Sequence, residues 1–155
     1  MFIKKEVFAT LIVLVTIAGC TERSKDDPKI AGPVSLAGSW KLLTGTIIEK
    51  GDTTVTDYTK DRSFIKIIND SHFAFLNHTL RKDTTDFSAG GGTYTLNGNS
   101  YTEHLEYCTA KEWEGHDFTF TVTIANDTLI QTGFEKIEAQ GIDRKNTEKY
   151  IRYKK

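Results

Sequence analysis

A carboxylate inside a run of aromatic residues is the most distinctive chemical feature of this sequence. Residues 90–107 read GGGTYTLNGNSYTEHLEY, with alternating runs rich in Thr and Tyr on both sides of Asn97-Gly98-Asn99. An Asn-Gly turn between two alternating runs predicts a β-hairpin. In that hairpin Glu103 shares one face with Tyr101 and Tyr107. Because burying a carboxylate without a partner is costly, this face suits a ligand cavity better than a packed core.

We expect the cavity to be lined by aromatic side chains and a few polar groups, the usual composition of a small-molecule site. The predicted lining residues are Phe73, Phe75, Tyr94, Tyr101, Glu103, Tyr107, Phe120 and Gln131. Two alternatives stay open at the level of sequence. Glu103 could pair with tyrosine hydroxyls or buried water in a filled interior, and a one-residue shift of strand register would turn it to solvent.

The opposite face of the same strand carries side chains that can bind metal ions. His104, Glu106 and Cys108 follow one another at i, i+2 and i+4, a spacing that can bring imidazole, carboxylate and thiolate to one soft metal. This face should be the exterior, however, where a solvated strand with a half-buried free thiol explains the residues equally well. We therefore expect no metal site and no cofactor.

Patterns typical of catalysis or of nucleic-acid binding are missing. No Gly-x-Ser-x-Gly elbow occurs, and no second inward carboxylate stands out beside Glu103 for acid–base work. The glycines at 90–92 precede a strand, whereas a phosphate-binding loop needs a helix N-terminus. With 20 basic and 21 acidic residues, the charge implies no nucleic-acid partner. We expect a binding protein and not an enzyme.

From Leu36 onward the sequence predicts β-structure almost throughout. The expected strands are residues 39–49, 53–58, 63–68, 72–80, the two arms of the hairpin within 90–107, 117–125, 128–134 and 147–153. Residues 135–146 are ambiguous, and residues 81–89 predict a loop at a cavity mouth. Thr109-Ala110-Lys111-Glu112 has the form of a capping box and predicts about one helical turn.

The strand at 117–125 has the plainest alternation, with its apolar residues expected to point inward. These residues are Phe118, Phe120, Val122 and Ile124. A two-residue turn at Asn126-Asp127 would then place Leu129 and Gln131 on the same side. Eight to ten short strands joined by hairpins, without βαβ alternation, predict an all-β fold: a small closed up-and-down antiparallel barrel with one short helical turn. A β-sandwich is the alternative.

The N-terminal residues predict export and lipid attachment. Lys4 and Lys5 precede an apolar run at 7–17 that is too short to span a bilayer. Ile17-Ala18-Gly19-Cys20 then resembles a bacterial lipobox, in which the cysteine is acylated; an ordinary secretory signal is the alternative. We expect a signal peptide at 1–19, an acylated Cys20 with a flexible tether over 20–35, and a barrel domain at 36–155.

Two further patterns resemble a known family. Gly38-Ser39-Trp40 resembles the Gly-x-Trp signature of lipocalins and related calycin barrels, and Glu148-x-Tyr150-x-Arg152 resembles the last strand of small lipocalin-like lipoproteins common in Bacteroidetes. Residues 88–107 are similar to the middle of that family. The chain departs from true lipocalins in lacking the pattern of a long C-terminal helix. The resemblance implies that Gly38, Trp40 and Arg152 close one barrel end, the guanidinium lying across the indole.

Together these features predict an envelope-anchored lipoprotein whose barrel binds a small hydrophobic or amphipathic molecule. Its expected partners are the membrane, through the lipid on Cys20, and that small ligand. Thr21 after the cysteine favours the outer membrane, by analogy with enterobacterial lipoproteins. The alternative is a structural module with a filled barrel that contacts another envelope protein through its outer face or the 81–89 loop.

Overall fold

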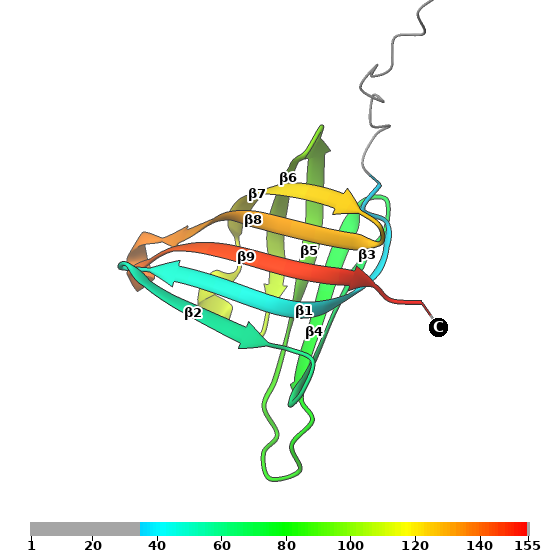
Figure 1. The fold of residues 1–155 in the computed structure, drawn as a ribbon. Coiled ribbons are helices and arrows are strands. Elements are labelled where there is room, and N and C mark those ends of the chain that lie inside the picture. Colours follow the sequence, from blue (N-terminus) through cyan, green and yellow to red (C-terminus); the bar gives the residue numbers. More distant parts are fainter. Residues whose placement is uncertain (1–34, 155) are drawn as a thin grey trace, which may run out of the picture. The chain divides into compact units, whose positions relative to one another are not determined.

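Nine antiparallel strands make up most of the computed structural model, which describes residues 35–154 (Figure 1). They are β1 (Gly38–Glu49), β2 (Asp52–Asp57), β3 (Arg62–Ile68), β4 (His72–Thr79), β5 (Phe87–Asn97), β6 (Ser100–Cys108), β7 (His116–Ala125), β8 (Thr128–Ile137) and β9 (Ile142–Arg152). Two single 3-10 turns, η1 (Lys111–Trp113) and η2 (Glu138–Gln140), interrupt the meander. Each segment with a clear alternating pattern therefore forms a strand.

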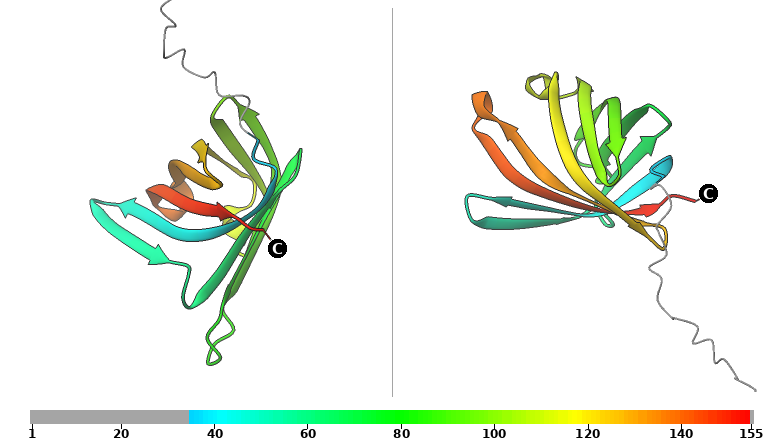
Figure 2. Two further views of the ribbon diagram at one scale, coloured as in Figure 1. Left: turned by 45° about the vertical axis from the view of Figure 1, so that its right-hand side comes forward. Right: turned by 90° about the horizontal axis from the view of Figure 1, so that it is seen from above.

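The sheet closes on itself because β1 pairs with strands on both of its edges. One edge is bonded to β9 from Trp40 to Glu49, and the other to β3 over residues 38–41. Beyond this point the second edge pairs with β2, so that β2 lies outside the ring formed by β1 and β3 to β9. Figure 2 shows the β1–β2 hairpin projecting from this ring. The predicted closed up-and-down barrel is confirmed, and the alternative sandwich is wrong.

The hairpin between β7 and β8 has the predicted two-residue turn. Asn126 and Asp127 both adopt positive φ values, 48° and 61°, as a tight turn matched to the strand twist requires. Val122 then lies opposite Gln131 across the ladder. The amide of Gln131 consequently points into the barrel, as the sequence pattern predicted.

A β-bulge between β5 and β6 explains the triple glycine. Gly91 pairs with Tyr107 and Gly92 with Leu105, leaving Glu106 as an extra residue in β6. A Cβ atom at Gly92 would lie 2.0 Å from the carbonyl oxygen of His104, and none of the three glycines has positive φ. The glycines are thus required by the close approach of neighbouring strands and side chains at this bulge.

Two local predictions are wrong. The predicted capping box does not form, because the Thr109 hydroxyl donates to the carbonyl of Ala89 (2.9 Å) and accepts from its N–H (2.8 Å). The irregular loop is also shorter than expected, since β5 already begins at Phe87. The ambiguous stretch 135–146 turns out to be the end of β8, the turn η2 and the start of β9.

One end of the barrel is closed by the residues that the family resemblance indicated. Trp40 is fully buried, and the guanidinium carbon of Arg152 lies 4.1 Å from the centre of its ring. Arg152 Nη1 donates to the carbonyl of Ala37 at 3.0 Å, and it occupies the space that a side chain at Gly38 would fill. The predicted contact of Trp40 with Arg152 is therefore present.

The predicted signal peptide and the predicted acylation site at Cys20 fall outside the described residues, as does all of the predicted 20–35 tether except Ser35. Within residues 35–154, no helix is long and apolar enough to cross a membrane.

Candidate functional site

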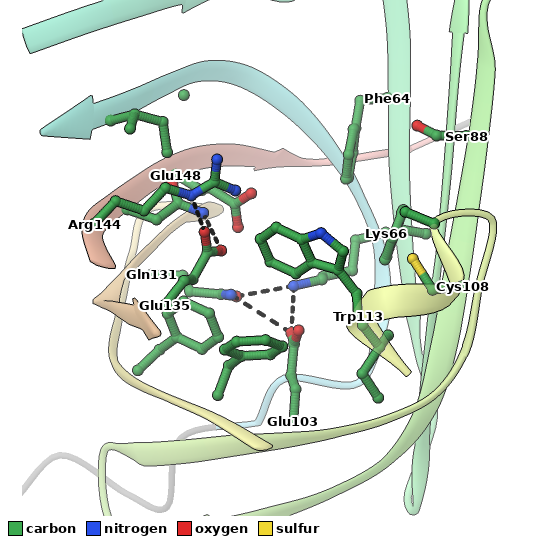
Figure 3. A pocket seen from close by; sticks show the side chains of 18 of the residues that line it. Phe64, Lys66, Ser88, Glu103, Cys108, Trp113, Gln131, Glu135, Arg144 and Glu148 are labelled. Carbon is green, nitrogen blue, oxygen red and sulfur yellow. Dashed lines mark hydrogen bonds and ion pairs between the residues drawn. The ribbon is translucent and has the colours of Figure 1, made fainter. Parts of the chain in front are cut away.

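The barrel encloses a cavity of about 370 Å³ along the half of β1 that follows Trp40. One part of its lining is aromatic, with Tyr58, Phe64, Phe75, Trp113, Phe118 and Phe120. Another part is charged or carries amides, with Lys66, Glu103, Gln131, Glu135, Arg144, Asn146 and Glu148. The remaining lining residues are Gly45, Ile47, Thr56, Ser88, Leu105, Cys108 and Ala110. The cavity is thus amphipathic, with several convergent polar groups (Figure 3).

Three polar side chains from three separate strands meet on one side of the cavity. Lys66 on β3 donates to Glu103 on β6 at 2.5 Å and to Gln131 on β8 at 3.1 Å. The amide nitrogen of Gln131 lies 3.5 Å from the same Glu103 oxygen. All three residues are buried, so the ion pair is shielded from solvent screening. The cluster satisfies the carboxylate that the sequence predicted inside the barrel, although by a lysine and not by tyrosine hydroxyls.

Aromatic rings surround the ammonium group of Lys66. Its nitrogen lies 5.6 Å from the ring centres of Phe73 and Tyr150 and 5.8 Å from that of Tyr101. These distances permit cation–π attraction, which helps to offset the cost of burying the charge. Burial first, and nearby glutamate charge second, raise the pKa of both tyrosines well above the usual value near 10. Both phenols are therefore neutral at physiological pH.

A second polar network joins β8 and β9. The buried carboxylate of Glu135 accepts from Arg144 Nε at 2.7 Å and from the Asn146 amide at 2.8 Å. The guanidinium of Arg144 also lies 4.9 Å from the ring centre of Trp113. Trp113 comes from η1 and packs on Phe118 with 5.5 Å between ring centres. This network holds the indole against the polar side of the cavity (Figure 3).

Glu148 is the third lining carboxylate, and aromatic residues surround it. One of its oxygens accepts a hydrogen bond from the Tyr150 hydroxyl at 2.8 Å. Phe64 lies edge-on to Tyr150 and to Tyr58, with ring centres 6.3 Å and 5.8 Å apart. Burial, followed by the charge of Glu148, raises the pKa of Tyr58. The carboxylate thus lies near a small group of rings: Tyr58 directly after β2, Phe64 on β3 and Tyr150 on β9.

Four of the eight predicted lining residues line this cavity, namely Phe75, Glu103, Phe120 and Gln131. Phe73 and Tyr101 are buried in the core, and their rings lie beside the ammonium group of Lys66. Tyr94 packs on Tyr101 and donates its hydroxyl to the carbonyl of Asn69. These three residues belong to the packed part of the interior or pack against it.

The inward orientation predicted for Tyr107 is wrong. The bulge at Glu106 reverses the alternation of β6, so Tyr107 is 68% exposed and Cys108 turns into the cavity. The same reversal separates the three residues that could have formed a metal site. His104 contacts Asp117 at 2.8 Å, and Glu106 accepts from Thr93 at 2.8 Å. Among the described residues, no three metal-ligating side chains converge.

The sequence prediction missed Lys66, Glu135, Arg144, Glu148 and Trp113. Residues 63–68 are apolar on both faces, so alternation alone gave no reason to turn Lys66 inward. For the last strand a signal did exist. Arg152 was expected to lie over Trp40, and counting back in steps of two from it places Glu148 and Arg144 on the same inward face.

No protein-family model matches this chain, and no curated protein matches it at a significant level of similarity.

Proposed function

We propose that this protein is a lipocalin-like lipoprotein of the bacterial envelope that binds one small amphipathic molecule inside its barrel without chemical conversion. The observation that carries the proposal is the amphipathic cavity within a closed β-barrel. Its volume of about 370 Å³ lies within the range of ligand pockets, and aromatic walls with a few convergent polar groups are typical of such sites. Eight-stranded barrels are wide enough to hold one small ligand.

The family assignment within the proposal depends on the Gly-x-Trp pattern and on the plug that it forms. Trp40 and Arg152 stack at one end of the ring, while the cavity extends along the remainder of β1. A barrel shut at one end and hollow towards the other fits a container for a small molecule. The lipid anchor on Cys20 and the outer-membrane location come from the sequence of residues 1–21 alone.

The rival function, a module that contacts another envelope protein, has one observation in its favour. Leu76 and Tyr107 are exposed on the outer face of β4 to β6, where they border a shallow groove over Gly91. A solid interior was part of that alternative, and the interior is hollow. We therefore give precedence to ligand binding.

Native mass spectrometry of the full-length protein, isolated from its own host in a mild detergent, tests the ligand proposal. The expected result is a discrete added mass that is lost when the protein is unfolded. The variant Ala110→Trp supplies the control, because a large ring placed among the lining residues should displace the added mass. A protein that carries no added mass and takes up no ligand in solution would contradict the proposal.

Metabolic labelling with an alkyne fatty acid tests the anchor separately. The wild-type chain and the variant Cys108→Ala should both incorporate the label, whereas Cys20→Ala should not. Because these are the two cysteines of the chain, the pair of variants forms a matched control. Equal labelling of Cys20→Ala and wild type would rule out the predicted lipobox.

A further inference from the structure

We propose that the ligand is a primary arylalkylamine, bound as the ammonium ion with its charge against Glu148 and its ring against the aromatic wall. This inference rests on the proposed ligand-binding function and names the chemical class of the ligand.

The charged side chains that line the cavity are not all paired. Three carboxylates line it, against two cations. Lys66 pairs with Glu103 at 2.5 Å, and Arg144 pairs with Glu135 at 2.7 Å. Within the described residues, Glu148 has no cation at ion-pair distance, and one of its oxygens receives only the Tyr150 hydroxyl. Glu148 is therefore the lining charge that lacks a counter-ion.

The carboxylate of Glu148 lies close to aromatic rings. Glu148 pairs across the ladder with Gly45, and the missing side chain there leaves room for the ring of Tyr58, 3.3 Å from where a Cβ would lie. Tyr58, Phe64 and Tyr150 are in edge-on contact with one another through Phe64. An ammonium group bonded to Glu148 would thus also lie near aromatic rings, which attract cations through their faces.

The charges of the cavity favour an amine ligand over a carboxylate ligand. Both lining cations already have protein partners, and Lys66 in particular contacts Glu103, Gln131 and three rings. Arg144 is held by Glu135 and stacked on Trp113. A ligand carboxylate would add a fourth negative charge to the cavity, whereas an ammonium would bring three against three.

The aromatic wall indicates the remainder of the molecule. Phe64 and Phe75 stack almost in parallel, 5.5 Å apart at 12°, next to the carboxylate subsite. A flat ring joined to the ammonium by a short chain could pack against these side chains while its charge meets Glu148. The cavity volume of about 370 Å³ accommodates one such molecule.

Isothermal titration of the full-length protein in nanodiscs, with empty nanodiscs as the blank, tests the inference with three probes that share a phenylethyl group and differ in the polar group. The probes are 2-phenylethylamine, 3-phenylpropionate and 2-phenylethanol at neutral pH. The amine is expected to bind at least tenfold more tightly than the other two. In Glu148→Gln, the amine affinity should fall at least tenfold while the affinity for the alcohol stays the same.

Controls separate a lost charge from a lost fold. Gln at position 148 can still accept the Tyr150 hydroxyl, so the variant should keep its thermal transition. Glu138→Gln removes a solvent-exposed carboxylate on η2, outside the cavity lining, and should bind as the wild type does. Equal or tighter binding of the carboxylate or alcohol would overturn the amine class and leave the binding function intact. Failure of all three probes to bind would overturn the arylalkylamine class, whereas the binding function itself is decided by the added mass in native mass spectrometry.

Discussion

Lys66 on β3 and Glu103 on β6 meet inside the barrel, with 2.5 Å between Nζ and Oε1. Both residues are buried, at 2% and 7% exposure, and they lie 37 positions apart in the sequence. Their contact connects opposite parts of the ring through its interior. Charged pairs in such positions are costly to break from one side, because the remaining ion keeps its desolvation penalty without its partner.

We expect Lys66→Met to lower the free energy of unfolding by about 3–5 kcal/mol, since it leaves Glu103 buried without a cation. Urea unfolding monitored by circular dichroism measures the change. The double variant Lys66→Met with Glu103→Leu should recover most of the loss. Lys60→Met is the matched control, because its pair with Asp57 is exposed to solvent and should contribute far less to stability than the buried pair. A loss at Lys66 no larger than at Lys60 would contradict the assigned role.

Removing the arginine of the plug should loosen the closed end. Arg152→Ala is expected to cost about 1–2 kcal/mol, because it removes the cation–π contact with Trp40 and the hydrogen bond to Ala37. Arg152→Lys keeps the charge and loses the planar stacking, so it should retain only part of the stability. Thermal melting together with near-UV circular dichroism of the indole measures both effects. Identical melting of all three proteins would refute the plug.

The glycines differ in how much space surrounds them, and alanine substitutions should reveal the difference. At Gly92 a Cβ would lie 2.0 Å from a backbone oxygen, so Gly92→Ala must move a neighbouring strand and should cost more than about 3 kcal/mol. At Gly45 the nearest atom is a carbon of the Tyr58 ring at 3.3 Å, which can shift. Gly45→Ala should therefore cost about 1 kcal/mol or less. Chemical unfolding of the two variants side by side gives the comparison.

Stability should fall steeply at high pH because of two buried tyrosines. Burial raises the pKa of Tyr101 and Tyr150 well above 10, so both phenols stay protonated in the folded chain. Their contribution is fully present below pH 10. Above it the unfolded chain ionises and the folded one does not, so each tyrosine lowers the free energy of unfolding by about 1.4 kcal/mol per pH unit.

Tyr101→Phe isolates one of these contributions. Within the described residues the Tyr101 hydroxyl is buried without a hydrogen-bond partner, so its removal should leave stability at pH 7 unchanged or slightly increased. The fall in stability above pH 10 should become shallower than in the wild type. Unfolding curves between pH 7 and 11 measure both quantities. An unchanged slope would show that Tyr101 ionises readily in the folded protein.

Cys108 offers a chemical probe of the cavity. Its half-buried thiol lies among the lining residues, so small alkylating reagents should reach it and a bound ligand should slow them. We expect at least a fivefold slower reaction with iodoacetamide in the presence of saturating 2-phenylethylamine, measured by intact mass. Glu148→Gln at the same amine concentration should lose this protection. Protection that persists in the variant would show that an amine bound at Glu148 does not shield the thiol.

The parts of the fold that the sequence predicted well are those where one face is apolar and the other polar. Phe118, Phe120 and Val122 alternate with threonines, and all three are buried. The turn at Asn126 and Asp127 then determined the pairing that turns Gln131 inward. Local pattern was sufficient there because burial and turn geometry favour the same arrangement.

The site was harder to predict, because its residues meet only when distant strands pair. Lys66 and Glu103 are 37 positions apart, and nothing local in residues 63–68 marks the lysine as buried. The predicted inward orientation of Tyr107 was wrong for a different reason. A single extra residue, Glu106, reverses the side chains that follow it in β6. The glycine at the bulge, Gly92, lies on β5, so the bulge leaves no signature within β6 itself.

The partial pairing of β1 has a consequence for how such a container can change in size. Near the plug this strand is bonded to β3, and further on it is bonded to β2, which makes no ladder with β3 (Figure 2). Insertions or deletions in β2, which lines the cavity through Thr56, can therefore reshape the cavity wall without breaking a hydrogen bond of the eight-strand ring. Sequence changes in this strand could thus alter which molecules the barrel holds, while the end closed by Trp40 keeps its structure.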